Sequence, residues 1–540
     1  MPPDLIARAL DSGSADDLRA VSESWAPGFN TRRIDPQIAR TLVDRGATLT
    51  VHAAAGLGFT DHLGRMLDDA PSLIDAKGGD ACTPLHFARD VATAELLLAR
   101  GARIDARDDD HESTPAQWSI GEAPDVARFL LNRGATPDIF LAAALGDRDL
   151  ATRLIDANPA CVSHRIGRLP DWPPLGHNSR GGTIYQWTLA FNSYPHQIAL
   201  LKGHPELFDL LWDRSDDTTR LLVSCVLNRR ADAEAIVARH SGMVASLPAV
   251  DLELLPRYCW ETNTNYDAVK LMLDLGFPIA HPETSHGYSA LHNAAWSGTA
   301  ILVDLLIARG APVDVVDPRY HATPLGFALH DCLVEKRHPE GEFSRVVKSL
   351  IEAGSPWDAF DYPTGDARLD EVFMEYLPHR IDGAAILGDE DLVSRLLGDH
   401  PSPEQLAMAL GGAAKGGHAP LCAALLARGA DVNGKSGEDR ATPLIHAVRG
   451  SADGSQATIE LLLHEGAEAG LANRYGTLPL HAAAWVGASV ETVRLLLGAG
   501  SAAHIEAKNE FGFTPARIAA EKERDEIAAL FRKFSSRSGS

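Results

Sequence analysis

The stretch Gly287–Ala328, GYSALHNAAWSGTAILVDLLIARGAPVDVVDPRYHATPLGFA, decides how the rest of the sequence is interpreted. Its opening phrase, Ser-Ala-Leu-His at 289–292, precedes a pair of alanines, and an apolar run with helical spacing follows and ends before Gly310. A similar phrase, Thr-Pro-Leu, begins at Thr323, 34 residues after Ser289. The stretch is therefore one copy of a repeat that contains two short helices.

Each part of the repeated phrase has a structural role. Ser or Thr caps the first helix, and Pro is tolerated in the first turn because its missing N–H would have no helical partner. The paired alanines let two helices approach closely, and the leucines form an apolar stripe that only a neighbouring repeat can cover. Gly310 can end the second helix in a left-handed conformation, after which we expect a short β-hairpin finger.

The phrase recurs along the chain as Thr83-Pro84-Leu85-His86, Thr442-Pro443-Leu444, Leu478-Pro479-Leu480-His481 and Thr514-Pro515. This pattern resembles the ankyrin repeat, whose period is about 33 residues and whose signature is Thr-Pro-Leu-His-x-Ala. The resemblance covers about four fifths of the chain and implies an all-α solenoid, a superhelix of about 13–14 helix-turn-helix units with short β-hairpin fingers.

The repeat register predicts the domain organisation of the chain. We expect an N-terminal cap over residues 1–48, ankyrin repeats over 49–160, an irregular aromatic insertion over 161–195, ankyrin repeats over 196–360 with an insertion near 331–345, an irregular link over 361–380, ankyrin repeats over 381–516, and a C-terminal capping helix and tail over 517–540.

Composition excludes several classes of function. The formal net charge is −23, with 73 acidic against 50 basic residues, which argues against a nucleic-acid or anionic-membrane surface and permits a basic partner without requiring one. Six cysteines include no Cys-x-x-Cys pair, so neither a disulfide framework nor a cysteine zinc site is indicated. The amino end lacks the design of a secretory signal, and no apolar run reaches the ~18–20 residues of a membrane span. We expect an acidic, cytoplasmic protein.

The resemblance also implies where a partner would bind. Ankyrin repeats contact partners mainly through finger residues near the turn glycine and through the two positions after the alanine pair. Carried onto this sequence, that pattern predicts binding by Tyr288, Trp296, Arg319, Tyr320, Arg474, Tyr475, Trp485, Phe511 and Phe513. Aromatic residues and Arg are typical of interface hot spots, each worth about 2 kcal/mol or more when buried in a complex. The alternative is that these aromatic side chains pack on adjacent fingers inside the solenoid.

No cofactor and no metal is predicted. His86, His292 and His481 belong to the repeat phrase itself, and the resemblance implies that they join neighbouring loops by hydrogen bonds. We therefore expect a monomeric, non-enzymatic scaffold that binds a protein or peptide along its concave face.

The insertion over 161–195 carries the alternative hypothesis, an enzyme or a protein that binds a small anionic or aromatic molecule. An acid, a base and an orienting group could come from Asp171, His177, Tyr185 and the adjacent His196. An anion site is predicted at Arg165, Arg168 and Arg180, beside two glycines whose N–H groups a carboxylate or phosphate could approach. The glycines belong to Ser-Arg-Gly-Gly at 179–182, which matches no phosphate-binding motif with fixed spacing. A loop that only covers a solenoid junction would also need polar and aromatic residues, so that alternative stays open.

Overall fold

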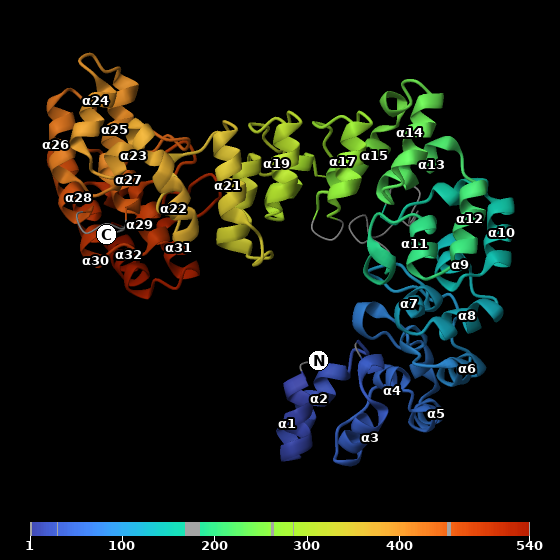
Figure 1. Ribbon diagram of the computed structural model, residues 1–540. Helices are drawn as coiled ribbons and strands as arrows, with labels where there is room; N and C mark the ends of the chain where they lie inside the picture. The colour runs from blue at the N-terminus through green and yellow to red at the C-terminus, as the bar shows by residue number, and fades with distance from the viewer. Residues whose placement is uncertain are drawn as a thin grey trace. The chain divides into compact units, whose positions relative to one another are not determined.

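The computed structural model describes residues 3–29, 31–167, 184–260, 264–283, 286–450 and 455–538. The chain divides into two compact units, residues 1–293 with 309–311 and residues 294–308 with 312–540. The regular structure of the described residues is helical (Figure 1), which confirms the predicted all-α solenoid. None of the described helices is long and apolar enough to cross a membrane.

Unit 1 consists of short helices in sequence order. They are α1 (Pro3–Ser12), α2 (Ala15–Trp25), η1 (Thr31–Arg33), α3 (Pro36–Asp44), α4 (Val51–Leu57), α5 (Thr60–Asp69), η2 (Pro71–Asp75), η3 (Gly79–Ala81), η4 (Pro84–Phe87), α6 (Val91–Ala99), α7 (Pro115–Glu122), α8 (Pro124–Asn132), α9 (Ile139–Leu145), α10 (Arg148–Ala157), η5 (Pro159–Ser163), η6 (Gln186–Ala190), α11 (Pro195–Leu201), α12 (Pro205–Asp213), α13 (Asp217–Val226), α14 (Arg230–Arg239), η7 (Val244–Ser246), α15 (Ala249–Leu252), α16 (Leu254–Arg257) and α17 (Tyr266–Asp274).

Helix α18 (Ala290–Trp296) contains the point at which unit 1 gives way to unit 2 along the chain. Unit 2 contains α19 (Ala300–Ala308), α20 (Pro324–His330), η8 (Asp331–Glu335), α21 (Phe343–Glu352), η9 (Ala359–Asp361), α22 (Ala367–Tyr376), η10 (Leu377–His379), α23 (Ile381–Ile386), α24 (Glu390–Leu397), α25 (Pro403–Lys415), α26 (Ala419–Ala427), α27 (Pro443–Arg449), α28 (Ser455–His464), α29 (Pro479–Val486), α30 (Val490–Gly498), η11 (Ser501–His504), α31 (Pro515–Glu521) and α32 (Asp525–Ser538).

The helices of unit 2 stack in two rows. The inner helices α23, α25, α27, α29 and α31 each pack on the next, and the outer helices α26, α28, α30 and α32 do the same. The inner row is rich in alanine, as at Ala413, Ala447 and Ala483, which are fully buried and let the backbones approach closely. In α25, a Cβ added at Gly412 would lie 2.3 Å from the Asp382 carbonyl oxygen, so this position requires glycine.

The predicted fingers are short hydrogen-bonded turns. In two of them an Asp or Asn closes the turn through its backbone N–H: Asp317 donates to the Ala322 carbonyl at 3.0 Å, and Asn509 donates to the Phe513 carbonyl at 3.0 Å. The side-chain oxygens of the same residues accept further N–H groups within the turn. Among the described residues, the one isolated β-bridge joins Ser436 and Ala441. The fingers therefore lie where the repeat phrase predicts them, but they form almost none of the backbone pairing of a β-hairpin.

The link predicted as irregular over 361–380 contains helix α22. The Asp366 side chain caps this helix by accepting the N–H groups of Arg368 and Leu369. Leu369, Val372 and Phe373 are buried at the i, i+3, i+4 spacing of one helical face. The helix forms because this face packs against α21, although the segment lacks the Thr-Pro phrase.

Candidate functional site

The repeat histidines tie each inner helix to the finger that follows it. The Leu478 N–H donates to Nδ1 of His481 at 3.2 Å, so the proton of the ring lies on Nε2. Nε2 faces the carbonyl oxygens of Ala507 at 3.1 Å and Phe513 at 3.0 Å. His86 repeats the arrangement with Thr83 and the Ser113 carbonyl, and burial lowers its pKa to about 4. These histidines are neutral and their ring nitrogens are engaged in holding fingers in place.

A cavity of about 630 Å³ lies between inner helices and fingers near the end of unit 2. We call it the C-terminal groove, and its lining consists of Asp361, Lys415, Arg449, Thr477, His481, Ala482, Trp485, Val486, Asn509, Phe511, Phe513, Ile518, Glu521 and Lys522. These residues come from α25, α27, α29 and α31, from the fingers before α29 and α31, and from the end of η9. Its volume falls within the range of roughly 300–1,000 Å³ in which small ligands or a few side chains are bound.

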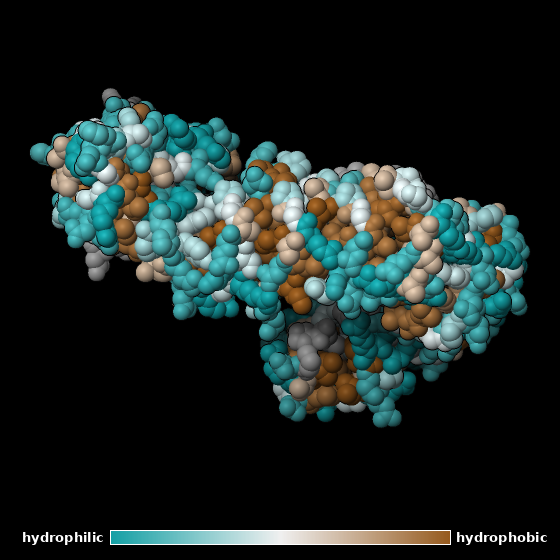
Figure 2. Space-filling model, turned by 45° about the horizontal axis from the view of Figure 1, so that its top comes forward, coloured by the Kyte–Doolittle hydropathy of each residue, from teal (hydrophilic) through white to brown (hydrophobic). Residues whose placement is uncertain are grey.

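The C-terminal groove has an exposed aromatic wall. Hydrophobic side chains reach the surface of the molecule in patches, as Figure 2 shows for one face. In the groove Trp485 is 59% exposed and Phe511 is 64% exposed. Trp485 lies in the last turn of helix α29, two residues before Gly487, whose φ of 71° ends the helix. Both rings line the same cavity, and soluble proteins rarely leave a contiguous apolar patch uncovered unless it contacts another molecule.

Cationic side chains lie on the faces of these rings. Lys522 Nζ is 4.1 Å from the centre of the Trp485 ring, and the Arg517 guanidinium is 4.4 Å from the centre of the Phe513 ring. Arg474 covers Tyr475 in the same way at 4.7 Å, and Tyr475 packs on Phe511 with 6.0 Å between ring centres. The five residues predicted here from the sequence, Arg474, Tyr475, Trp485, Phe511 and Phe513, thus form one continuous surface.

The floor of the C-terminal groove carries charge. Lys415 ends helix α25 and is half-buried, and loss of solvent lowers its pKa while the Asp361 carboxylate opposes that change. The pKa of Asp361 is raised to about 6, first by the surrounding protein atoms and then by the nearby carboxylates of Asp358, Glu438 and Asp439 against the pull of Lys415. The Asp361 residue nevertheless remains exposed to solvent.

A second aromatic cluster in unit 2 contains three further predicted residues. The Trp296 ring stacks on His330 at 5.8 Å and meets Phe327 edge-on at 5.8 Å. Tyr320 is 60% exposed, packs on Phe327, and is covered by the Arg319 guanidinium at 5.1 Å. Trp296 is half-buried, and its Nε1 is buried without a hydrogen-bond partner in the described part of the chain. Trp296 and Trp485 share a repeat position, yet only Trp485 presents its ring to solvent.

Tyr288 takes a different place from the other predicted anchors. It is buried, and its ring is nearly parallel to those of Trp260, 6.5 Å away, and His286, 5.3 Å away. The tyrosine therefore supports its own finger in unit 1, and we leave it out of the candidate surface.

The residues of the alternative hypothesis are dispersed where the structure describes them. Arg168, Asp171, His177 and Arg180 lie outside the described residues. Arg165 is buried and donates to the Val250 carbonyl at 2.9 Å, while the buried Tyr185 hydroxyl donates to Asp138 at 2.7 Å. His196, whose pKa burial lowers to about 4, lies 3.0 Å from the Ser215 hydroxyl. Tyr185 and His196 thus belong to two different buried hydrogen-bond networks.

Two groups of side chains in unit 1 have ligand-type atoms close together, Cys82 with His86 and Asp108, and Asp80 with Asp110 and His111. In the first group, both ring nitrogens of His86 already make hydrogen bonds, and burial raises the pKa of the Cys82 thiol. Asp108 accepts backbone N–H groups of its own finger and Nε1 of Trp118. The second group is a mainly exposed acidic cluster around His111. We therefore propose no metal site at either group.

One phosphate-binding pattern in the sequence lies in the wrong structural context. Residues 429–436, GADVNGKS, match the spacing of a P-loop, which requires a preceding strand and a helix that opens at the lysine. Here helix α26 precedes the segment, Lys435 donates to the Ala472 carbonyl at 2.6 Å, and Ser436 forms the bridge of a finger. The pattern is therefore part of an ordinary repeat.

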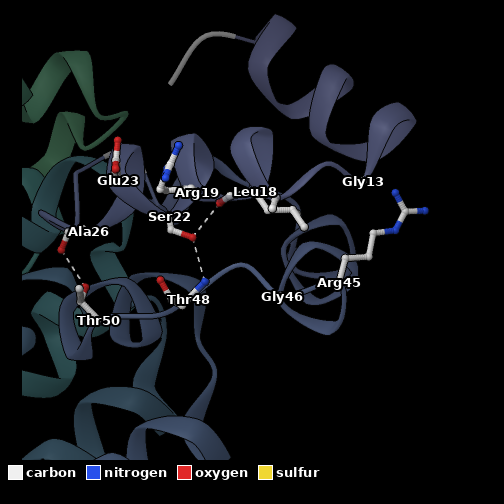
Figure 3. Close-up of a pocket in the computed structure, with 11 residues that line it drawn as sticks. Gly13, Leu18, Arg19, Ser22, Glu23, Ala26, Arg45, Gly46, Thr48 and Thr50 are labelled. Atoms are coloured by element: carbon white, nitrogen blue, oxygen red, sulfur yellow. Dashed lines mark hydrogen bonds between the residues drawn. The ribbon is translucent and has the colours of Figure 1, made fainter.

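A second cavity, of about 560 Å³, lies in unit 1 beside helix α2. Figure 3 shows a chain of hydrogen bonds along it, in which the Thr48 N–H donates to the Ser22 hydroxyl at 2.8 Å and that hydroxyl donates to the Leu18 carbonyl at 2.8 Å. The Thr50 hydroxyl donates to the Ala26 carbonyl at 2.7 Å. Because these polar groups satisfy one another and no predicted residue lines the cavity, the C-terminal groove is the stronger candidate.

Comparison with known families agrees with the repeat phrase. The family model of the ankyrin repeat matches residues 80–109 and 286–318, and the model of three ankyrin-repeat copies matches residues 450–535. The match over residues 450–535 contains α29, α31 and the fingers before them, which supply most of the lining of the C-terminal groove. No curated protein matches the chain.

Proposed function

Since the chain belongs to the ankyrin-repeat family, whose repeats are generally protein-interaction modules, we propose that it is a scaffold that binds a segment of a partner protein in the C-terminal groove. The observation that carries this proposal is the pair of exposed rings, Trp485 and Phe511, inside a cavity built by inner helices and fingers. We propose that the scaffold is a monomer and that it performs no chemistry.

The energetics favour recognition at this place. A buried aromatic side chain removes about 150–250 Å² from water, and interface hot spots of this kind contribute about 2 kcal/mol or more each. Trp485 and Phe511 need no rearrangement to be covered, because His481 and Asn509 already fix the helix and the finger that present them. A partner side chain would therefore gain contact area at little conformational cost.

The alternative, a small-molecule pocket at 161–195, receives less support. Tyr185 and His196 are buried in separate networks, and each hydrogen-bonds to a group of the repeat scaffold.

The six cysteines are free and buried, which is compatible with the reducing, cytoplasmic compartment predicted from the sequence.

The proposal is tested with peptides selected by the full chain from a random display library. Affinities of the selected peptides are measured by fluorescence polarisation for wild type, Trp485→Ala and Phe511→Ala. The matched control is Trp187→Ala, which removes a tryptophan that is 72% exposed in unit 1. We expect each groove variant to weaken binding at least tenfold and the control to change it less than twofold. Equal affinity for wild type and both groove variants would overturn the proposal.

A further inference from the structure

The lining of the C-terminal groove carries one more cation than carboxylates, although the chain as a whole is acidic. The protein carries a formal net charge of −23, but the groove is lined by the cations Lys415, Arg449 and Lys522 against the carboxylates Asp361 and Glu521. A small basic site in an acidic protein selects partners more sharply than net charge does, because complementary potentials act over about 8–10 Å at physiological salt.

Some of these charges already have partners within the protein. Arg449 donates to the Asp439 carboxylate at 2.6 Å, and Glu521 accepts from Arg517 at 2.8 Å. These two ion pairs neutralise one cation and one carboxylate of the groove lining. They leave Lys415, Lys522 and Asp361 in the lining, while the carboxylates of Asp358 and Glu438 act on Asp361 from outside the lining.

Neither lysine forms an ion pair with a residue that the structure describes. Among the residues that the structure describes, Lys415 makes no side-chain hydrogen bond or ion pair, and Lys522 contacts only the face of Trp485 at 4.1 Å. Lys415 lies on α25 and Lys522 directly follows α31, so the two amines approach the groove from different helices of the inner row. Lys415 is half-buried and forms no ion pair with a described residue, because Asp361 and Asp358 act on it only from beyond ion-pair distance. A carboxylate supplied by a ligand would give the ammonium a closer counter-charge and offset its cost of burial.

From this arrangement, and resting on the proposed function, we propose that the partner segment is acidic and carries an aromatic or large aliphatic side chain between carboxylates. The apolar side chain packs against Phe511 and Trp485, and the flanking carboxylates pair with Lys415 and Lys522. A basic segment would place cations beside both lysines and find only Asp361 as an unpaired anion of the lining. Charge complementarity therefore favours the acidic occupant.

The test uses three capped, dye-labelled heptapeptides and the full chain. The first has a central tryptophan flanked by six Asp and Glu residues, the second replaces these six by Lys and Arg, and the third keeps the acids but has a central alanine. We expect the acidic tryptophan peptide to bind at least tenfold more tightly than either of the others. Its affinity should fall at least tenfold on raising NaCl from 50 to 500 mM, because the proposed contacts are ionic.

Lysine variants test whether the acidic peptide binds through Lys415 and Lys522. Lys415→Gln with Lys522→Gln should weaken the acidic peptide at least tenfold, and Lys522→Gln alone, at an exposed side chain, should weaken it at least threefold. The matched control is Lys348→Gln, because Lys348 forms an exposed ion pair with Glu375 and takes no part in the groove. Circular dichroism melts confirm that each variant remains folded.

The outcomes separate this inference from the proposed function. If the basic peptide binds as tightly as the acidic one, or the lysine variants bind the acidic peptide like wild type, the inference is wrong. If the basic peptide is preferred and its binding is lost in Trp485→Ala, the groove recognises peptides of the other charge and the proposed function stands. If no peptide binds in a manner that depends on Trp485, both proposals fail.

Discussion

Removal of the two tryptophans at one repeat position should cost different amounts of stability. Trp296 is half-buried and packs on Phe327 and His330, whereas Trp485 is 59% exposed and has the Lys522 ammonium over its ring. Replacing a fully buried Trp by Ala lowers the free energy of unfolding by about 3–5 kcal/mol. For Trp296→Ala we expect a loss of about 2 kcal/mol, because Trp296 is only half-buried and because its removal also removes a buried N–H group that has no hydrogen-bond partner among the described residues. Trp485→Ala loses an exposed cation–π contact, so we expect about 0.5–1 kcal/mol.

The assay is urea unfolding of the full chain, followed by circular dichroism and by hydrogen exchange of α18 and α20. Hydrogen exchange is needed because repeat arrays open locally and a single global transition is not assured. Trp296→Phe is the matched variant, since it keeps a ring in the cluster and removes the unpaired N–H, and it should stay within about 1 kcal/mol of wild type. Equal destabilisation by Trp296→Ala and Trp485→Ala would refute the distinction between a packing residue and a binding residue.

Three further predictions follow from single contacts. Asp361→Asn should raise the thermal midpoint above that of wild type at pH 7.5, and the two midpoints should converge as pH falls through about 6. The reason is that the pKa of Asp361 is raised in the folded state, so wild type gains stability when Asp361 is protonated and loses it as pH rises. His481→Ala should cost about 2 kcal/mol and speed hydrogen exchange of the finger at 507–513, because it removes the link to the Phe513 carbonyl; unchanged exchange there would contradict the role. Gly412→Ala should cost more than about 2 kcal/mol, since its Cβ meets the Asp382 carbonyl oxygen at 2.3 Å, and a thermal melt within 1 °C of wild type would show that the helices can separate freely.

The repeat architecture could be predicted from the sequence because each repeat carries its own signals. Thr442 and Thr514 cap helices with proline in the first turn, and glycines such as Gly310 lie in the left-handed region at the ends of second helices, as the phrase predicts. The repeat phrase does not indicate helix α22, because the signal for this helix is the Asp366 cap with three apolar residues on one face.

The candidate site could be predicted only in part. The aromatic positions follow from repeat register, so Trp485, Phe511 and Phe513 were predicted from single repeats. Exposure depends on the neighbouring repeat, which places Phe327 and His330 against Trp296 but a lysine against Trp485. Lys415 and Lys522 come from different repeats far apart in the chain, and no local pattern indicates that they line one cavity.

The measurement that tests the central claim most directly is hydrogen–deuterium exchange of the full chain with and without a peptide selected from the display library. The account predicts protection of the finger at 507–513 and of the end of α29, with no change in residues 184–195. Protection confined to residues 184–195, with the C-terminal groove unaffected, would contradict it and make the insertion the binding site.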